Sequence, residues 1–467
     1  MRWLAFFLVG CGLFAAAISA AAADRPNLVV FIADDLGQLD TSPYGAQDVR
    51  TPNLQRLAKA GLRFTHAFVA SPACAPSRAA LLTGLMPARN GAEPNHSKPR
   101  AELKKLPAYL QALGYEVVSF GKVAHYGHGK DYGFDRVSHE GFQNYASVPA
   151  AAEFLASRKS EQPLCLLVGT HWPHVPWPQE ANDYEPAKVS LPPTHVDTTA
   201  TRLWRTRYYA AVTKMDDDMG TVYDAVQKHL DLSGTIFLFT SDHGGQWPFG
   251  KWNLYDAGTR VPLIVAGPGI AAGEKTGALV SWIDLLPTLV ELGGGDPPAE
   301  IDGRSFAAVI QGAAAEHRDE IFTTHSGDGR FNVYPIRSVR DRDWKYIRNL
   351  HPEYQHATHI NRAAAGDGLG YFRSWEDAAQ SDPAAAAIVA RYRQRPREEL
   401  YDLEADPHEQ TNLAAAPAHA ERLAAMREKV TVWMAAQQDT SRVYGDPLLV
   451  GEEAPPIQPA SKGKTKK

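Results

Sequence analysis

Four short apolar runs, each followed at once by polar residues, constrain the fold of this chain more than any other feature. The runs span residues 27–33, 116–120, 164–169 and 235–240, and helix-prone stretches separate them. Short, continuous apolar runs bounded by turn residues are typical of strands that are buried on both faces of a parallel sheet. The sequence therefore predicts an α/β domain with a large mixed, mostly parallel sheet flanked by helices.

The residues that follow these runs are types that bind anions, bind metals or transfer protons. They are Asp34 and Asp35 after the first run, Lys122 and His125 after the second, His171 and His174 after the third, and Asp242 and His243 after the fourth. Open α/β sheets bind ligands beyond the carboxyl ends of their strands. Loops are exposed to solvent, which explains polar residues after any one strand. Polar residues of these types after all four strands instead indicate a single site at one edge of the sheet.

A change of pattern near residue 320 indicates a second, smaller unit. Residues 336–340 and 344–348 flank a polar turn and predict an antiparallel hairpin, and residues 399–403 could add an edge strand. Helices are expected at residues 202–230, 281–292 and 378–392. The expected divisions are a signal peptide at 1–23, a catalytic domain at 24–319, an α+β subdomain packed on the main sheet at 320–451, and a disordered tail at 452–467.

The N-terminus has the pattern of an export signal. Arg2 precedes a mostly apolar stretch, and small residues then lead through Ala23 to Asp24. We expect cleavage after Ala23, a periplasmic or secreted protein, and no transmembrane span in the mature chain. Two alternatives remain: Leu-Val-Gly-Cys ending at Cys11 resembles a lipoprotein box, and the stretch could be retained as an anchor although it is short for a membrane-spanning helix.

Charge and cysteine content exclude other classes of protein. The net charge is −5 and no basic stripe is present, which argues against nucleic acid as a partner. Of the three cysteines, Cys11 would leave with the signal and Cys165 lies in an apolar run, as a core residue would. Two remaining cysteines are too few for a disulfide framework. Cys74 is the one that needs an explanation.

Cys74 begins the sequence Cys-Ala-Pro-Ser-Arg, which precedes the helix-prone residues 79–83. Pro76 suits a first helical position and Gly84 a helix end, so Cys74 would lie just before a helix N-terminus. The helix dipole and the charge of Arg78 would then lower the pKa of the thiol and activate it. The alternative is a structural cysteine beside a capped helix.

Residues 74–84, with Cys-x-Pro-Ser-Arg followed by Leu-Thr-Gly, resemble the maturation signature of the sulfatase family. The resemblance extends over nearly the whole mature chain and implies an alkaline-phosphatase-like fold. In that family a formylglycine-generating or sulfatase-maturating enzyme oxidises the cysteine to formylglycine (3-oxoalanine), whose hydrated aldehyde is the nucleophile. The resemblance therefore implies such an enzyme as a partner during biogenesis and Cys74 as the source of the nucleophile.

Oxygen-rich metal ligands are available from two predicted strand ends, at Asp34, Asp35, Asp242 and His243. Neighbouring carboxylates repel one another unless a cation lies between them, and Ca²⁺ suits several carboxylates in a loose shell. An Asp-Asp pair alone is more often a turn or a helix cap. The resemblance implies one Ca²⁺ bound by these residues together with Cys74, and the softer His243 keeps Mg²⁺ and Mn²⁺ as alternatives.

The resemblance also implies roles for the remaining polar residues. Lys122 and Lys251 would hold sulfate oxygens where negative charge accumulates. His125 would help to release sulfate, and His174 would protonate the leaving group, since histidine titrates near neutrality. Asp242 is the expected base for the attacking hydroxyl.

The substrate is expected to be a sulfated saccharide or another small sulfated molecule. Residues 247–255 and 335–340 most resemble the heparan N-sulfatase branch, whereas residues 121–125 resemble the iduronate-2-sulfatase form. An N-sulfoglucosamine-type substrate is the best single choice. The same fold hosts phosphate and phosphonate monoester hydrolases, and an inactive exported glycan-binding protein is a third reading. Cys74 and a single metal favour sulfate over phosphate, and the complete set of polar positions favours an enzyme.

Overall fold

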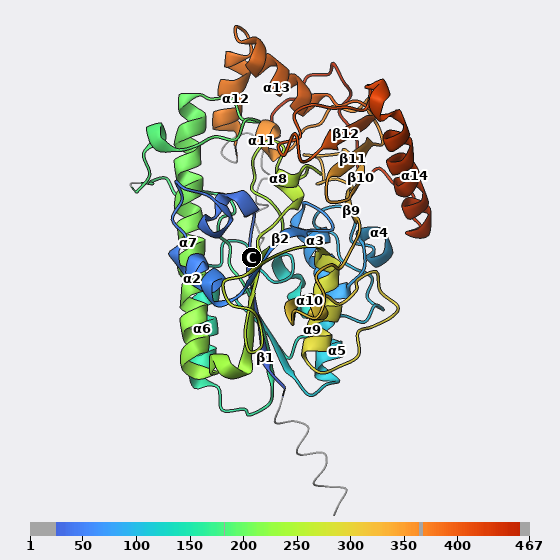
Figure 1. Ribbon diagram of the computed structural model, residues 1–467. Coiled ribbons are helices and arrows are strands. Elements are labelled where there is room, and N and C mark those ends of the chain that lie inside the picture. The colour runs from blue at the N-terminus through green and yellow to red at the C-terminus, as the bar shows by residue number, and fades with distance from the viewer. Residues whose placement is uncertain (1–24, 182, 364–367, 458–467) are drawn as a thin grey trace, which may run out of the picture.

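A computed structural model describes residues 25–457, apart from residue 182 and residues 364–367. A large central sheet is covered by helices on both faces, and a smaller sheet lies beside one end of it (Figure 1). The expected signal peptide, Cys11 and residues 458–467 of the expected tail lie outside the described residues. Within the described part, no helix is both long and apolar enough to span a bilayer.

The large sheet has eight strands among the described residues, in the order β4-β3-β5-β1-β6-β7-β2-β8. They are β1 (Asn27–Ala33), β2 (Leu62–Phe68), β3 (Glu116–Gly121), β4 (Arg136–Ser138), β5 (Leu164–Gly169), β6 (Thr235–Ser241), β7 (Leu263–Ala266) and β8 (Lys275–Ser281). Only the two pairings of β7 are antiparallel within this described sheet. The prediction of a mixed, mostly parallel sheet is confirmed, and the four apolar runs form its adjacent strands β3, β5, β1 and β6.

Side chains of β1 alternate between two cores, as the pleat of a strand requires. Val29 and Phe31 face one core, and Leu28 and Val30 face the other. The first core lies under α2 (Pro52–Ala60), α6 (Ser147–Ser157) and α7 (Thr199–His229). The second lies under α3 (Cys74–Thr83), α5 (Leu106–Gln111), α9 (Leu285–Leu292) and α10 (Ala307–Ile310). The central strands are therefore buried on both faces, which explains their continuous apolar sequence.

The smaller sheet is antiparallel, with the order β12-β11-β10-β9 among the described strands. Its strands are β9 (Ile321–His325), β10 (Ile336–Arg340), β11 (Trp344–Asn349) and β12 (Glu398–Asp402), and α14 (Ala420–Ala436) packs on them. The predicted hairpin and edge strand are confirmed. Residues 452–457 of the tail that is expected to be disordered are described by the structure. There, Ile457 N–H donates a hydrogen bond to Arg362 O at 2.6 Å.

The helix expected at residues 378–392 is confirmed from residue 383 onward, and its expected start is too early. α12 (Leu369–Ala378) ends and α13 (Pro383–Arg393) begins at Pro383. The side chain of Asp382 accepts a hydrogen bond from Ala384 N–H and caps the second helix. A proline at the first helical position with an aspartate before it starts a new helix.

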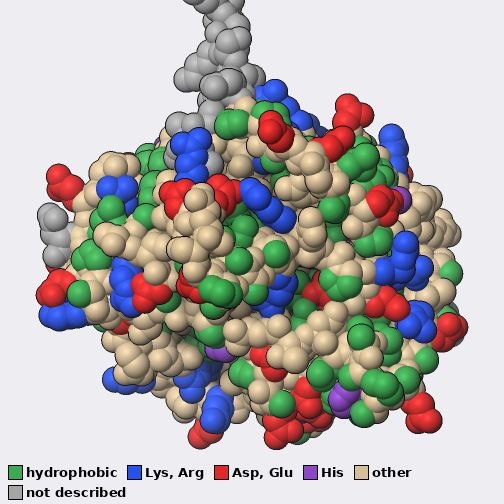
Figure 2. Space-filling model, turned by 90° about the horizontal axis from the view of Figure 1, so that it is seen from above, with side chains coloured by type: hydrophobic (Ala, Val, Ile, Leu, Met, Phe, Trp, Pro, Cys, Tyr) green, Lys and Arg blue, Asp and Glu red, His purple; other side chains and the backbone are tan. Residues whose placement is uncertain are grey.

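The surface mixes charges of both signs. On the face that Figure 2 shows, lysine and arginine side chains are interspersed with aspartate and glutamate side chains. The charged residues that argue for a function are instead buried, at the carboxyl edge of the large sheet.

Candidate active site

The carboxyl ends of four parallel strands meet at one edge of the large sheet. Ala33 of β1 lies beside Ser241 of β6, and Gly121 of β3 lies beside Gly169 of β5. Because these strands are in register, the residues that follow them are neighbours. The buried side chains gathered at this edge are Asp34, Asp35, Lys122, His125, His171, His174, Asp242 and His243.

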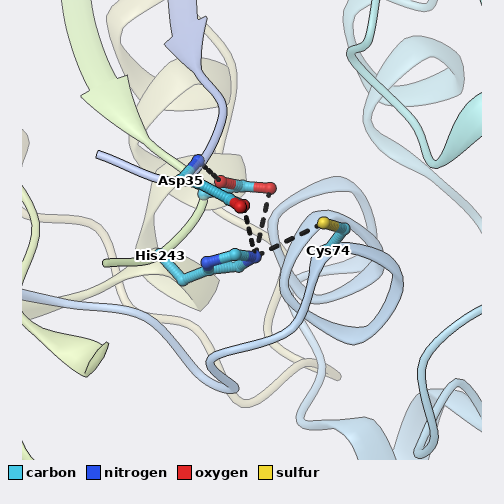
Figure 3. Close-up of side chains that lie close together, drawn as sticks. Asp35, Cys74 and His243 are labelled. Carbon is cyan, nitrogen blue, oxygen red and sulfur yellow. Dashed lines mark hydrogen bonds and ion pairs between the residues drawn. The ribbon is translucent and has the colours of Figure 1, made fainter. Parts of the chain in front are cut away.

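Cys74 reaches the same edge from α3, whose ten residues are all buried. It is the first residue of the helix rather than the residue before it. The Cys74 Sγ atom lies 3.4 Å from His243 Nε2, as Figure 3 shows by a dashed line. It also lies 3.4 Å from Lys122 Nζ and 3.8 Å from Asp34 Oδ1. The helix therefore presents Cys74 directly to the polar residues of the strand ends.

The expectation of an activated thiol is wrong for the unmodified cysteine. Burial raises the pKa of the Cys74 thiol to about 12. Lys122 and Lys251 lower this pKa, but Asp34 and Asp242 raise it again. Since the thiolate is the nucleophilic form, an unmodified Cys74 would be unreactive at neutral pH.

Arg78 fixes α3 to the ends of three strands. Its Nε donates to Asp242 Oδ2 at 2.9 Å, its Nη2 donates to Asp34 Oδ1 at 3.1 Å, and its Nη1 donates to Lys122 O. Burial alone would lower the pKa of Arg78, but the two carboxylates raise it above its ordinary value. The side chain is thus a permanent buried cation that holds the helix start against β1, β3 and β6.

Two buried lysines pair with the two carboxylates that follow β1. Lys122 Nζ lies 2.5 Å from Asp34 Oδ2, and Lys251 Nζ lies 2.8 Å from Asp35 Oδ2. Burial would raise the pKa of Asp34, but Lys122, His174 and Arg78 hold it well below its usual range. Burial raises the pKa of Asp35 with help from Asp34 and Asp242, against the opposing effect of Lys251. Asp35 is therefore the less well compensated carboxylate.

Four residues offer a set of atoms that fits a metal ion. Ligand atoms of Asp35, Cys74, Asp242 and His243 all lie within 4.8 Å of one another. His243 Nδ1 faces Gly244 O at 3.0 Å, which places the proton on Nδ1 and leaves Nε2 free to bind a metal. Crowded buried carboxylates are stabilised by a divalent cation. Asp34, the fifth expected ligand, lies next to this group, with its Oδ1 3.8 Å from Cys74 Sγ, and its carboxylate pairs with Lys122 and Arg78.

Two histidines after β5 lie beside the carboxylates. His174 Nδ1 donates to Val175 O at 2.6 Å, and its Nε2 lies 3.9 Å from Asp35 Oδ2. Burial, Lys251 and Lys122 lower the pKa of His174 well below its usual value. Neither ring nitrogen of His171 has a hydrogen-bond partner within the described residues. The half-exposed Phe142 lies edge-on against both histidine rings and covers them.

Three residues that the sequence pattern does not identify complete the surroundings. Asn95 Oδ1 accepts a hydrogen bond from Ala75 N–H, beside Cys74. His96 Nδ1 lies 2.7 Å from His125 Nε2, and His96 Nε2 lies 3.2 Å from Asp328 Oδ1. None of the three follows a predicted strand or belongs to the Cys74 motif, so no sequence signal identifies them.

Two family models match the chain. The model described as Sulfatase matches residues 26–295, and the model described as N-sulphoglucosamine sulphohydrolase, C-terminal, matches residues 243–358. An ulvan-active sulfatase from Formosa agariphila is 31% identical over 448 residues, which cover 92% of this chain and 84% of the relative. The N-sulphoglucosamine sulphohydrolase of Homo sapiens is 28% identical over 499 residues, which cover 93% of this chain and 95% of the relative.

Solved structures share the fold at lower identity. A protein solved in complex with its substrate D-glucosamine-2-N,6-O-disulfate superposes with a TM-score of 0.68 at 20% identity, over 89% of this chain and 99% of that chain. The phosphonate monoester hydrolase of Agrobacterium radiobacter superposes with a TM-score of 0.69 at 19% identity, over 88% and 96% of the two chains. The expected alkaline-phosphatase-like fold is confirmed.

Proposed function

Because the chain belongs to the sulfatase family, a family of sulfuric ester hydrolases, we propose that it hydrolyses sulfate esters or sulfamates of a saccharide. The observation that carries the proposal is the placement of Cys74 at the start of α3, facing Asp35, Asp242 and His243 in one buried group. The match to the N-sulphoglucosamine sulphohydrolase C-terminal model and the similarity to the human enzyme of that name favour an N-sulfoglucosamine-type substrate.

The nucleophile of this proposal is formylglycine made from Cys74 by a maturation enzyme. The Cys-x-Pro-Ser-Arg motif supports it, and so does the high pKa of the unmodified thiol, which makes cysteine itself a poor nucleophile here. When present, the hydrated aldehyde supplies one hydroxyl to attack sulfur and a second hydroxyl whose deprotonation allows sulfate to leave. Asp242, held by Arg78 and next to the start of α3, is the proposed base for the attacking hydroxyl.

One divalent cation is proposed at Asp35, Asp242, His243 and the residue at position 74, with Asp34 close by. Ca²⁺ is the first choice because carboxylate oxygens are its preferred ligands, and the His243 nitrogen keeps Mg²⁺ and Mn²⁺ as alternatives. Such an ion would supply positive charge next to the sulfate oxygens.

The charges of the site balance before any cation is added. Three buried carboxylates face three buried cations, namely Asp34, Asp35, Asp242, Arg78, Lys122 and Lys251. A divalent cation would therefore leave the site positive, which favours an anionic substrate in a region shielded from water. Lys122 and Lys251 would then contact sulfate oxygens and hold them in place.

His174 and His125 are the proposed proton carriers. The Nδ1 atom of His174 is engaged by Val175 O, so Nε2 is the atom that faces Asp35 and would protonate the leaving group. An anion bound between Lys122 and Lys251 would oppose the effect of these lysines and raise the pKa of His174. His125 is assigned to the release of sulfate.

The test combines mass spectrometry with substrate comparison. The protein is produced with a maturation enzyme, and the peptide that contains Cys74 is analysed for the aldehyde. Release of sulfate from N-sulfoglucosamine, glucosamine 6-sulfate and an aryl sulfate is compared with release of phosphate from an aryl phosphate. We expect the aldehyde and faster turnover of the sulfated compounds. A thiol at position 74 without sulfate release would contradict the proposal, and faster phosphate release would favour the phosphate monoesterase alternative.

Export is a separate proposal that rests on the N-terminal sequence. The apolar stretch after Arg2 and the small residues up to Ala23 support cleavage before Asp24, with a lipoprotein anchored at Cys11 as the alternative. N-terminal sequencing of protein recovered from the periplasm or medium should begin at Asp24. Recovery in the membrane fraction with an intact or lipid-linked N-terminus would contradict cleavage at this position.

A further inference from the structure

We propose that His96 and Asp328 form a positioning pair that fixes the tautomer of His125, so that the Nδ1 atom of His125 is the one that accepts a proton. The inference rests on the proposed function, in which His125 assists the release of sulfate. Neither His96 nor Asp328 would touch the reacting atoms. Both act through the ring of His125.

His96 connects the other two side chains through its ring nitrogens. Its Nε2 lies 3.2 Å from Asp328 Oδ1, and its Nδ1 lies 2.7 Å from His125 Nε2. The two histidine rings meet edge to face, with centroids 4.7 Å apart. His96 has a positive φ of 65°, a backbone conformation that the surrounding structure has to stabilise.

The carboxylate of Asp328 determines where the protons lie. It accepts only, so His96 Nε2 carries the hydrogen and Nδ1 is left as an acceptor. The hydrogen of the His125 Nε2–H group then points to His96 Nδ1, and His125 Nδ1 keeps its lone pair. His125 Nδ1 is buried and has no hydrogen-bond partner within the described residues. Burial and Lys122 lower the pKa of His125 well below its usual value, so the ring is neutral and its tautomer matters.

Asp328 is well suited to this role because other partners hold it rigidly. Its Oδ2 accepts hydrogen bonds from Asn95 Nδ2 at 2.9 Å and from Trp252 Nε1 at 2.7 Å. Burial would raise the pKa of Asp328, but His359 and His96 hold it well below its usual range, so the carboxylate is ionised. Asn95 in turn accepts a hydrogen bond from Ala75 N–H, next to Cys74, and Trp252 follows Lys251 in the chain. Asp328 is therefore linked to the surroundings of both Cys74 and Lys251.

A second buried Asp-His pair shows what a purely structural pair contacts. His317 Nε2 lies 3.1 Å from Asp284 Oδ2, and Arg318 also pairs with Asp284. His317 packs on Phe306 instead of on a histidine of the site. His359, which lies 3.6 Å from Asp328 Oδ2, stacks on Phe331 and on Trp252. His317 therefore offers a matched control position, whereas His359 belongs to the surroundings of Asp328.

The first experiment measures turnover of the mature enzyme on the substrate that it hydrolyses fastest. We expect His96→Ala to lower kcat by about 10- to 100-fold with little change in KM, as for other residues that orient a functional side chain. Because the His96 side chain is 50% exposed, added imidazole should restore part of the lost kcat. His317→Gln should keep kcat within about threefold of the parent. Unchanged kcat in His96→Ala, no recovery with imidazole, or an equal loss in His317→Gln would each overturn the proposal.

A second measurement needs no turnover and uses unconverted protein labelled with ¹⁵N-histidine. The His125 signals are assigned by their loss in His125→Gln. We expect an unprotonated Nδ1 in the parent and a mixture of tautomers in His96→Ala and Asp328→Asn. A protonated Nδ1 in the parent would refute the inference. If the parent releases no sulfate but shows the expected tautomer, the proposed function fails and the positioning pair stands.

Discussion

Two buried networks of charge in this protein can be compared directly. The active-site network joins three carboxylates to Arg78, Lys122 and Lys251. The second, here called the Asp256 cluster, comprises Asp256, Arg260, Arg340, Lys345 and Glu409. In both networks every carboxylate has a cation within about hydrogen-bonding distance, and both lie where segments distant in sequence meet. Burial and ion pairing therefore do not distinguish them.

What differs is the chemistry that surrounds the charges. Lys345 Nζ lies 2.5 Å from Asp256 Oδ1 and 2.6 Å from Glu409 Oε1, which ties α8 (Asp256–Thr259) to the smaller sheet. The active-site network adds a thiol, metal-ligand geometry and histidines with unpartnered nitrogens. A buried network of charges indicates a functional site when some of its polar atoms have no partner in the protein and can still bind a ligand or a metal ion. The Asp256 cluster instead joins two parts of the fold.

The largest expected effect separates the two networks by activity alone. Cys74→Ala should lower kcat by at least about 1,000-fold, because it removes the source of the nucleophile. The melting temperature of the metal-free protein should change little, since alanine suits the first turn of a helix. Sulfate release and thermal unfolding are measured on the same preparation. If Cys74→Ala kept a tenth of the parent activity, Cys74 could not be the source of the nucleophile.

A paired substitution of buried lysines sharpens the comparison. Lys251→Met should lower kcat by about 100- to 1,000-fold, the usual effect of losing a preorganised donor to developing charge. Lys345→Met should leave kcat of the folded protein unchanged. Both variants should lower the free energy of unfolding by about 3–5 kcal/mol, because each leaves a buried carboxylate without its partner.

The two lysine variants need one shared control and two assays. Lys188→Met removes an exposed salt bridge to Glu185 and should change neither quantity measurably. Denaturant unfolding and initial rates are measured for all three variants. An exchange of the two activities, with Lys345→Met inactive and Lys251→Met active, would show that the networks have been assigned the wrong way round.

Metal removal should affect only the active-site network. A chelator is expected to abolish activity and lower the melting temperature, and Ca²⁺ at 100 times its dissociation constant should add about 2.7 kcal/mol to the free energy of unfolding. Asp35→Asn should lose this response, whereas Glu409→Gln should keep it. Titration with Ca²⁺, Mg²⁺ and Mn²⁺ ranks the ions. A parent protein whose unfolding ignores all three ions contradicts the proposed site.

The last expected effect is a pH dependence of stability that comes from the Asp256 cluster and leaves activity unchanged. Burial and the nearby Asp256 raise the pKa of Glu409 from 4.5 to about 7, against the effect of Lys345. The folded state thus binds a proton more tightly than the unfolded state does, so this contribution to stability is complete below pH 4.5 and is lost as the pH rises to about 7. Glu409→Gln should flatten this part of the profile.

The pH experiment compares unfolding between pH 4.5 and 7 in the parent, Glu409→Gln and Glu316→Gln. Glu316 pairs with Arg342 at the surface and is 70% exposed, so its variant should follow the parent. Parallel profiles for the parent and Glu409→Gln would mean that Glu409 titrates normally in the folded protein.

The central sheet is predictable because its strands are buried on both faces and read as continuous apolar runs. Strand β2 cannot be predicted in this way, because Arg63 and His66 interrupt its apolar residues. This strand runs parallel to β1 and brings the chain to the edge where α3 begins, so the position of Cys74 depends on an element that the pattern hides.

Much of the site is predictable because its residues directly follow strands or belong to the Cys74 motif. Asp328 and His96 cannot be predicted from the sequence, since they lie in loops that only the tertiary fold brings together. The sequence predicts a lowered pKa for the Cys74 thiol, yet this pKa rises because burial outweighs the charges of Lys122 and Lys251. Desolvation depends on packing around a residue, which local sequence does not reveal.

Every residue of α3, from Cys74 to Thr83, is buried in the folded protein. Under the proposed conversion of Cys74, a maturation enzyme would therefore need access to this segment before it packs against the sheet. Under the same proposal, a molecule that folds first would keep its thiol. The active fraction of a preparation would then depend on the rate of modification relative to the rate of folding. Slower folding at low temperature should therefore increase the converted fraction when the maturation enzyme is abundant.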